Sequence, residues 1–114
     1  MLSERYPVLW VGQAAVISVP AEVDVTNADK VRKCLLSVIG RGARVLVVDM
    51  TATAFCDCAG VSAIVDCFKR AAAEGASVRL AVTAPVVNRV FTITGVGRLV
   101  DIFPTVAAAL AGPG

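Results

Sequence analysis

Apolar and polar residues alternate along this chain with a period that changes several times, and each change predicts a new element. Residues 8–19, VLWVGQAAVISV, have the composition of two short strands joined at Gly12 and Gln13. From Thr26 onward the apolar residues recur at helical spacing, at Val31, Cys34, Leu35, Val38 and Ile39. Thr26, with Asp29 three residues later, is typical of an N-terminal cap, and Gly40 marks the end of the periodic stretch. The pattern therefore predicts two short strands followed by an amphipathic helix.

The rest of the chain repeats a strand followed by a helix. Residues 44–50, RVLVVDM, form a continuous apolar run that is typical of a strand buried on both faces. A second helix is expected after TATAFCDC and ends at Glu74 and Gly75; its apolar stripe consists of Val61, Ile64, Val65, Phe68 and Ala72. Residues 77–84, SVRLAVTA, predict the next strand, and residues 85–94 predict a shorter helix that begins at a proline. The segment LVDIF predicts a last short strand, and TVAAALA predicts a final helix.

The expected order of elements is ββαβαβαβα, with a helix between most pairs of strands. Such alternation implies right-handed crossovers and strands that run mainly parallel. We therefore expect an α/β fold with a single mixed, mostly parallel β-sheet and about four helices. A chain of 114 residues without a repeat or linker suits a single domain over residues 1–114.

The charge pattern argues against two classes of partner. The net charge is only +2 and the basic residues are spread along the chain, so nucleic-acid binding is not expected. Charged residues interrupt every apolar stretch before it reaches the length of a membrane span. The N-terminus carries Glu4 and Arg5 where a secretory peptide would have its apolar segment, so we expect a cytoplasmic protein.

The chain has no histidine and four cysteines. The commonest general base and the commonest metal ligand are therefore absent, and we expect neither an enzyme nor a metal or other cofactor. In a cytosolic chain the cysteines are expected to be free thiols. Cys34 and Cys67 fall on or beside apolar helix faces, which favours a role as core residues.

The segment FCDCAGV, residues 55–61, stands where a predicted strand ends and a predicted helix begins. Asp57 is the expected N-terminal cap of that helix, since its carboxylate can accept from the unpaired N–H groups of the first turn. Cys56 and Cys58 bracket it, but two thiolates without a histidine do not make a zinc site. A cysteine nucleophile would lack its base, and the chain has no phosphate-binding loop.

Three segments, in order and at similar intervals, resemble the STAS domain and, more narrowly, the bacterial anti-sigma factor antagonists. PAEVDVTNADKVRKCL stands in place of a G-E-[LV]-D turn into a helix, with Ala21 at the glycine position. VLVVDMTATAFCDCAGVSAIV resembles a strand that runs into F-x-D-[ST]-[ST]-G, and VTAPVVNRVFTITGVGRLVDIFPT resembles the end of the domain. The resemblance covers nearly the whole chain and implies a STAS fold.

The resemblance also implies a function in partner switching. A STAS antagonist binds an anti-sigma factor, itself a serine kinase, and so frees a sigma factor; phosphorylation in the D-[ST]-[ST]-G segment breaks that complex. Carried over to this sequence, the partner-binding residues are Glu22, Asp24, Asp57, Cys58, Ala59, Gly60 and Ser62.

The phosphorylation site is degenerate in this sequence. Cys58 and Ala59 occupy the two hydroxyl positions, and Ala59 stands where the phosphorylated residue is expected. Ser62 and Thr53 are the nearest remaining hydroxyls. A phosphoryl group beside Asp57 would add about −1.5 to −2 charges and weaken a tight interface. Without an acceptor, this switch is expected to be missing.

Three interpretations of this loss stay open at the level of sequence. The chain is an antagonist that cannot be phosphorylated at Ala59, a thiol-based redox regulator that uses Cys58, or a scaffold or small-molecule-binding STAS domain. For Cys58, the helix start favours reactivity and the neighbouring Asp57 opposes it.

Overall fold

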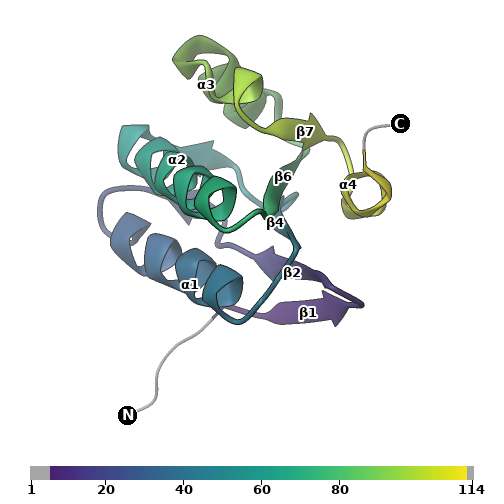
Figure 1. The fold of residues 1–114 in the computed structure, drawn as a ribbon. Coiled ribbons are helices and arrows are strands. Elements are labelled where there is room, and N and C mark those ends of the chain that lie inside the picture. Colours follow the sequence, from purple (N-terminus) through teal and green to yellow (C-terminus); the bar gives the residue numbers. More distant parts are fainter. Residues whose placement is uncertain (1–5, 113–114) are drawn as a thin grey trace.

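Five strands form the central sheet of the computed structural model, which describes residues 6–112 (Figure 1). Their order across the sheet is β1-β2-β4-β6-β7, with bounds Val8–Val11, Ala14–Ser18, Val45–Met50, Ser77–Val82 and Asp101–Phe103. β1 pairs antiparallel with β2, and all other neighbours in this sheet pair in parallel. The predicted α/β fold with a mixed, mostly parallel sheet is confirmed.

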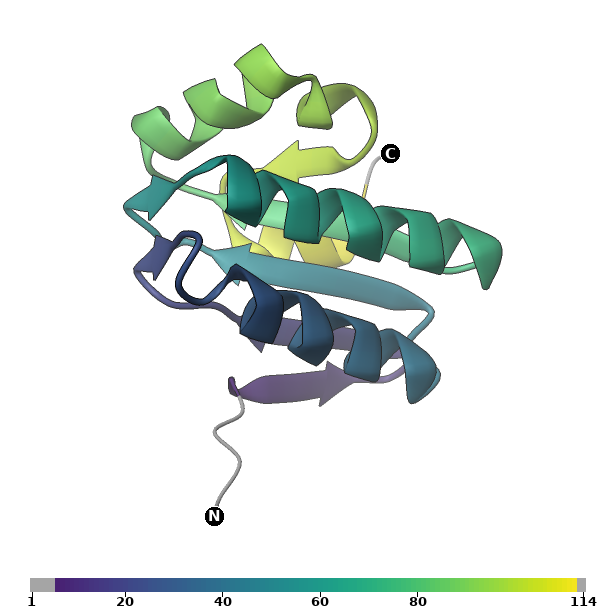
Figure 2. The ribbon, with the colours of Figure 1, turned by 90° about the vertical axis from the view of Figure 1, so that its left-hand side faces the viewer.

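Helices cover both faces of the sheet. The helices are α1 (Ala28–Gly40), α2 (Cys58–Ala73), α3 (Pro85–Thr94) and α4 (Val106–Ala111), with a short 3₁₀ turn, η1, at Val96–Arg98. α1 and α2 lie side by side on one face, and α4 lies on the other, against β4, β6 and β7 (Figures 1 and 2). None of the helices among residues 6–112 combines the length and the apolar character needed to cross a membrane.

The continuous apolar run of β4 fits this two-faced arrangement. Leu46, Val47 and Val48 are all completely buried. Leu46 and Val48 pack into the larger core under α1 and α2, whereas Val47 packs with Ala109 of α4 in a smaller cluster on the other face. Because successive side chains of a strand point to opposite faces, a strand covered on both sides needs apolar residues at every position.

A second, two-stranded pair was not predicted from the sequence. β3 (Glu22–Val23) pairs in parallel with β5 (Phe55–Cys56) beyond the carboxyl end of β4. Two-residue strands are too short to show a period in the sequence. The pair matters because it joins the turn before α1 to the segment before α2.

Two local predictions were wrong, and a third was right only in part. Thr26 and Asp29 do not cap α1: the helix begins after Asn27, without a side-chain cap, and Thr26 donates instead to Asp24. Ala72 is exposed, and the buried face of α2 passes through Cys67 and Ala71. Cys34 packs against the core but is only half-buried, because it also lines a cavity.

Other predicted boundaries agree with the structure. Gly95 ends α3 with a left-handed backbone, φ 84°, and Thr105 caps α4 by accepting from the Ala108 N–H. Glu4 and Arg5, on which the argument about secretion depended, lie outside the described residues.

Candidate functional site

The loop after β4 is fastened to the turn before α1. Thr53 is only 1% exposed, and its hydroxyl donates to the Pro20 carbonyl at 2.9 Å. The Ala54 N–H donates to the Ala21 carbonyl at 2.7 Å. The Thr53 hydroxyl is therefore committed to holding the loop, and it is not accessible as a substitute phosphate acceptor.

Asp57 organises the start of α2, as predicted. Its Oδ1 accepts from the N–H groups of Ala59 (2.9 Å) and Gly60 (3.1 Å), two of the donors that a helix start leaves unpaired. Its Oδ2 accepts from the Val25 N–H at 3.2 Å, and its own N–H donates to the Val23 carbonyl at 3.1 Å. One carboxylate thus fixes both the helix start and the neighbouring turn.

The turn with Glu22 and Asp24 lies beside Asp57, since β3 pairs with β5 and the Val25 N–H donates to the Asp57 carboxylate. Asp24 accepts from the hydroxyl and the N–H of Thr26. The Thr26 hydroxyl, and then its N–H, hold the pKa of Asp24 below its usual value. Asn27 completes the turn, since its Oδ1 accepts from the Asp24 N–H and its Nδ2 donates to the Glu22 carbonyl. Asp24 therefore shapes the turn, and Glu22 projects as an exposed acid.

Gly60 lies where a side chain does not fit. A Cβ at this position would stand 2.6 Å from Cys56 Sγ and 2.8 Å from Val23 Cγ1. The absence of a side chain therefore lets α2 start directly against the β3–β5 pair. Cys56 is buried in this contact, and burial, with the neighbouring negative charges of Asp57 and Cys58, raises its thiol pKa to about 11.

The other residues at the start of α2 face outward. Cys58 and Ser62 are exposed and Ala59 is half-buried. Two apolar side chains stand beside them in the open, Val25 at 77% and Phe55 at 47% exposure. We call this surface the Asp57 corner, defined by Glu22, Asp24, Val25, Phe55 and residues 57–62. Val25 and Phe55 were not among the site residues predicted from the sequence. The sequence feature that could have indicated them is an apolar residue next to each acidic motif.

A shallow groove of about 360 Å³ continues from the Asp57 corner between α1 and α2. Ala59 and Ser62 line one wall, and Val25 and Ala28 line the other. Arg32 forms ion pairs with Asp29 and, at 4.0 Å, with Asp66 at the rim. The groove is therefore apolar at its end near the Asp57 corner and charged further along, and it contains the position at which the resemblance places a phosphate.

The thiols and acids are not arranged for metal binding or for a disulfide. Among residues 6–112, no three Cys, Asp or Glu side chains are grouped so that they could hold a metal ion. All four cysteines are free thiols, as predicted. Burial raises the pKa of Cys67 to about 12, so that this thiol, like Cys56, is unreactive at neutral pH. Cys58 is the exposed thiol of the four.

Comparisons with known proteins agree with this architecture. Residues 8–109 match the profile of the STAS domain family. A candidate anti-anti-sigma factor of Mycobacterium tuberculosis is 32% identical over 109 residues, which cover 90% of this chain and 73% of that protein.

Solved structures share the fold. An anti-sigma factor antagonist from Mycobacterium paratuberculosis superposes with a TM-score of 0.85 at 22% identity, covering 93% of this chain and 90% of the other. The antagonist SpoIIAA in its unphosphorylated form gives a TM-score of 0.77 at 21% identity, covering 92% of each chain. SpoIIAA of Bacillus has also been solved in a phosphorylated form.

Proposed function

Because this chain belongs to the STAS domain family, we propose that it is a non-enzymatic regulator that binds a serine-kinase-like anti-sigma factor and thereby frees a sigma factor. The docking surface is the Asp57 corner with its adjoining groove. The complex forms in the cytoplasm, and Ala59 keeps it from being broken by phosphorylation at the usual position. The single observation that supports this proposal best is the accessible and rigid Asp57 corner.

Accessibility and rigidity are both properties that a docking surface needs. Val25 and Phe55 present apolar area that no other part of residues 6–112 covers, and burial of such area is the main favourable term in association. The Val25 N–H donates to the Asp57 carboxylate and the Phe55 N–H donates to the Ala21 carbonyl, so that both residues are held in place before binding. A surface fixed in advance loses little conformational entropy when a partner docks.

A phosphorylated side chain in place of Ala59 would lie in the groove beside Asp57. Ala59 lines the groove next to the Asp57 cap, so that a phosphorylated side chain here would put about two further negative charges beside an existing carboxylate. Ser62 is exposed in the same groove, three residues later, which corresponds to a rise of about 4.5 Å along the helix. A kinase that positions residue 59 therefore does not present Ser62 to its γ-phosphate.

Phosphorylation is the first test. Purified serine-kinase-type anti-sigma factors of the source organism are each mixed with the chain and ATP, and phosphate incorporation and complex formation are measured. We expect one of them to bind the wild-type chain with ATP present and to add no phosphate. Ala59→Ser should be phosphorylated and then released, and Ser62→Ala should behave as the wild type. Phosphate on Ser62 of the wild-type chain would contradict the proposal.

The docking surface is tested separately by substitution. Phe55→Asp and Val25→Asp should each weaken binding to the anti-sigma factor by at least about tenfold, because each places an unpaired charge in the interface. Leu9→Asp is the matched control, since Leu9 is 63% exposed but lies on β1, at the far edge of the sheet. An equal loss with Leu9→Asp, or no loss with either corner variant, would place the interface elsewhere.

A redox-responsive regulator is the second candidate, and the exposure of Cys58 within the Asp57 corner favours it. Mild peroxide would convert this thiol to a sulfenic acid or to a mixed disulfide with an added thiol. Affinity for the anti-sigma factor should then fall on oxidation and recover with a reductant, and Cys58→Ser should abolish the change. Equal affinity in the oxidised and reduced states would exclude this function.

A further inference from the structure

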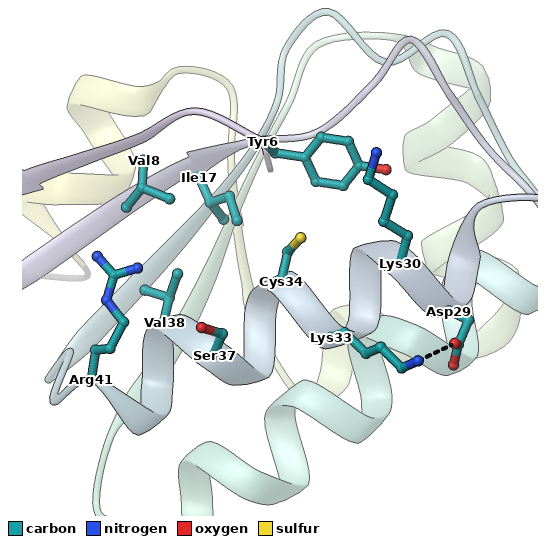
Figure 3. A pocket seen from close by; sticks show the side chains of 10 residues that line it. All are labelled: Tyr6, Val8, Ile17, Asp29, Lys30, Lys33, Cys34, Ser37, Val38 and Arg41. Carbon is teal, nitrogen blue, oxygen red and sulfur yellow. Dashed lines mark ion pairs between the residues drawn. The ribbon is translucent and has the colours of Figure 1, made fainter. Parts of the chain in front are cut away.

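A second and larger cavity lies on the other side of α1. It has a volume of about 410 Å³ and opens between α1 and the hairpin of β1 and β2 (Figure 3). The groove of the Asp57 corner lies between α1 and α2, so that the two hollows lie on different sides of the helix and share only Asp29 among their lining residues. A volume of several hundred Å³ is in the range of small-molecule sites.

The inside of this cavity is apolar. Val8 and Ile17 of the hairpin face Cys34 and Val38 of α1, and the ring of Tyr6 closes one end (Figure 3). Ile17 and Val38 are almost completely buried, so that they form a firm wall. Cys34, which has a short side chain, lines the cavity from the α1 side. These contacts suit an alkyl chain, not a polar ligand.

The rim of the cavity is positively charged. Lys30 and Lys33 of α1 line it together with Arg41, the C-cap residue that follows the helix, and Asp29 is the one carboxylate among the lining residues. Asp29 is already paired with Lys33 at 3.1 Å and with Arg32. The lining therefore carries an excess of positive charge, which complements an anion.

Arg41 is the best placed of these cations to receive an anionic group. Its guanidinium lies over the ring of Trp10, 5.6 Å from the centroid, and forms no ion pair within residues 6–112. Lys33 is engaged by Asp29, and Lys30 lies 4.9 Å from the centroid of the Tyr6 ring. A planar guanidinium held over an aromatic ring can bind a carboxylate through two parallel hydrogen bonds.

We propose that this cavity binds a medium-chain fatty acid as its carboxylate. The alkyl chain lies between Val8, Ile17, Cys34 and Val38, with its methyl end toward Tyr6, and the carboxylate lies on Arg41. Lys30 and Arg41 are eleven residues apart on α1, about 16 Å by the helical rise, which accommodates a chain of roughly eight to twelve carbons. This ligand site is independent of the anti-sigma factor proposal, because it uses the opposite side of α1.

The experiment uses the full chain and the fluorescence of Trp10, the only tryptophan, with hexanoate, octanoate and decanoate as ligands below their micellar concentrations. Each two carbons should tighten the dissociation constant by about tenfold, because each buried CH₂ contributes a similar transfer free energy. Decyltrimethylammonium, which has the same chain and the opposite charge, should bind at least about tenfold more weakly than decanoate.

Two variants test the two halves of the site. Arg41→Gln should weaken decanoate binding at least tenfold while leaving decanol binding unchanged, and Lys69→Gln on the exposed side of α2 is the matched charge control. Cys34→Leu fills the cavity and should abolish binding of decanoate, measured by calorimetry, in a chain that still unfolds cooperatively. In the Cys58→Ser background, decanoate should also slow alkylation of Cys34 at least tenfold.

The outcomes separate the proposal from its rivals. Decanoate binding that neither Arg41→Gln nor Cys34→Leu reduces would be non-specific and would overturn the proposal. Equal affinity for decanoate and the quaternary ammonium would overturn the role of the positive rim. An absence of saturable binding to the folded wild-type chain would overturn the site as a whole.

Discussion

The Asp57 corner and the cavity beneath α1 lie on opposite sides of one helix and are built in opposite ways. At the Asp57 corner, one carboxylate accepts from three backbone N–H groups, and Gly60 brings α2 against β3 and β5 without room for a methyl group. The cavity is bordered by ends of side chains, and its carboxylate, Asp29, makes ion pairs with the side chains of Arg32 and Lys33. A surface fixed by backbone hydrogen bonds suits the docking of a protein, whereas a space between side chains suits a small molecule.

The two cysteines of these regions should differ most in chemical reactivity. Cys56, buried beneath the Asp57 corner, is 2% exposed and has a pKa of about 11, so that at pH 8 only about one thiol in a thousand is ionised. Cys34 borders the open cavity. In a Cys58→Ser background, alkylation at pH 8 followed by peptide mass spectrometry should modify Cys34 at least about a hundredfold faster. Similar rates would mean that the Asp57 corner opens readily.

Glycines in the two regions provide the next comparison. Gly60→Ala should lower the free energy of unfolding by about 1–3 kcal/mol, because the new methyl group would overlap Cys56 and Val23. Gly40→Ala is the control, since Gly40 ends α1 near the cavity with nothing within 4 Å of an added Cβ. It should be neutral or stabilising by up to about 1 kcal/mol. Urea denaturation measures both; equal effects would contradict the tight packing at residue 60.

Removal of one carboxylate from each region should give a smaller difference in the free energy of unfolding. Asp57→Ala removes the cap of α2 and leaves the Val25 N–H without its partner, so we expect a loss of about 1–2 kcal/mol in unfolding free energy. Asp29→Ala removes a carboxylate whose side chain is 60% exposed, and surface ion pairs of this kind contribute at most about 1 kcal/mol. A larger loss for Asp29→Ala in urea denaturation would reverse the assignment of rigid and loose regions.

The same contrast explains what the sequence could predict. The cap by Asp57 was predictable because its helix donors are two and three residues away, and the fold was predictable because the apolar run of β4 and the stripe of α1 are local patterns. The predicted Thr26 cap was wrong because Asp24, two residues earlier, accepts hydrogen bonds from the N–H and the hydroxyl of Thr26.

What the sequence could not predict depends on distant segments. The Val25 N–H reaches Asp57 across 32 residues, and the Thr53 hydroxyl reaches Pro20 across 33. The cavity requires the hairpin of β1 and β2 to lie beside α1, since its lining residues come from both. No period or motif in one segment contains this information, because it arises when the elements pack.

The smallest expected effect concerns Asp24, which shapes its own turn without tying two helices together. Its pKa in the folded chain lies below the usual 3.8 because the Thr26 hydroxyl and N–H stabilise the charged carboxylate. A lowered pKa means that this contribution to stability is present above pH 3.8 and is lost as the pH falls through the folded value. Asp24→Asn should therefore show a shallower loss of unfolding free energy on acidification from pH 5 to pH 3 than the wild type, measured by urea denaturation at about four pH values. An unchanged slope for Asp24→Asn would show that the Thr26 donors do not favour the charged form.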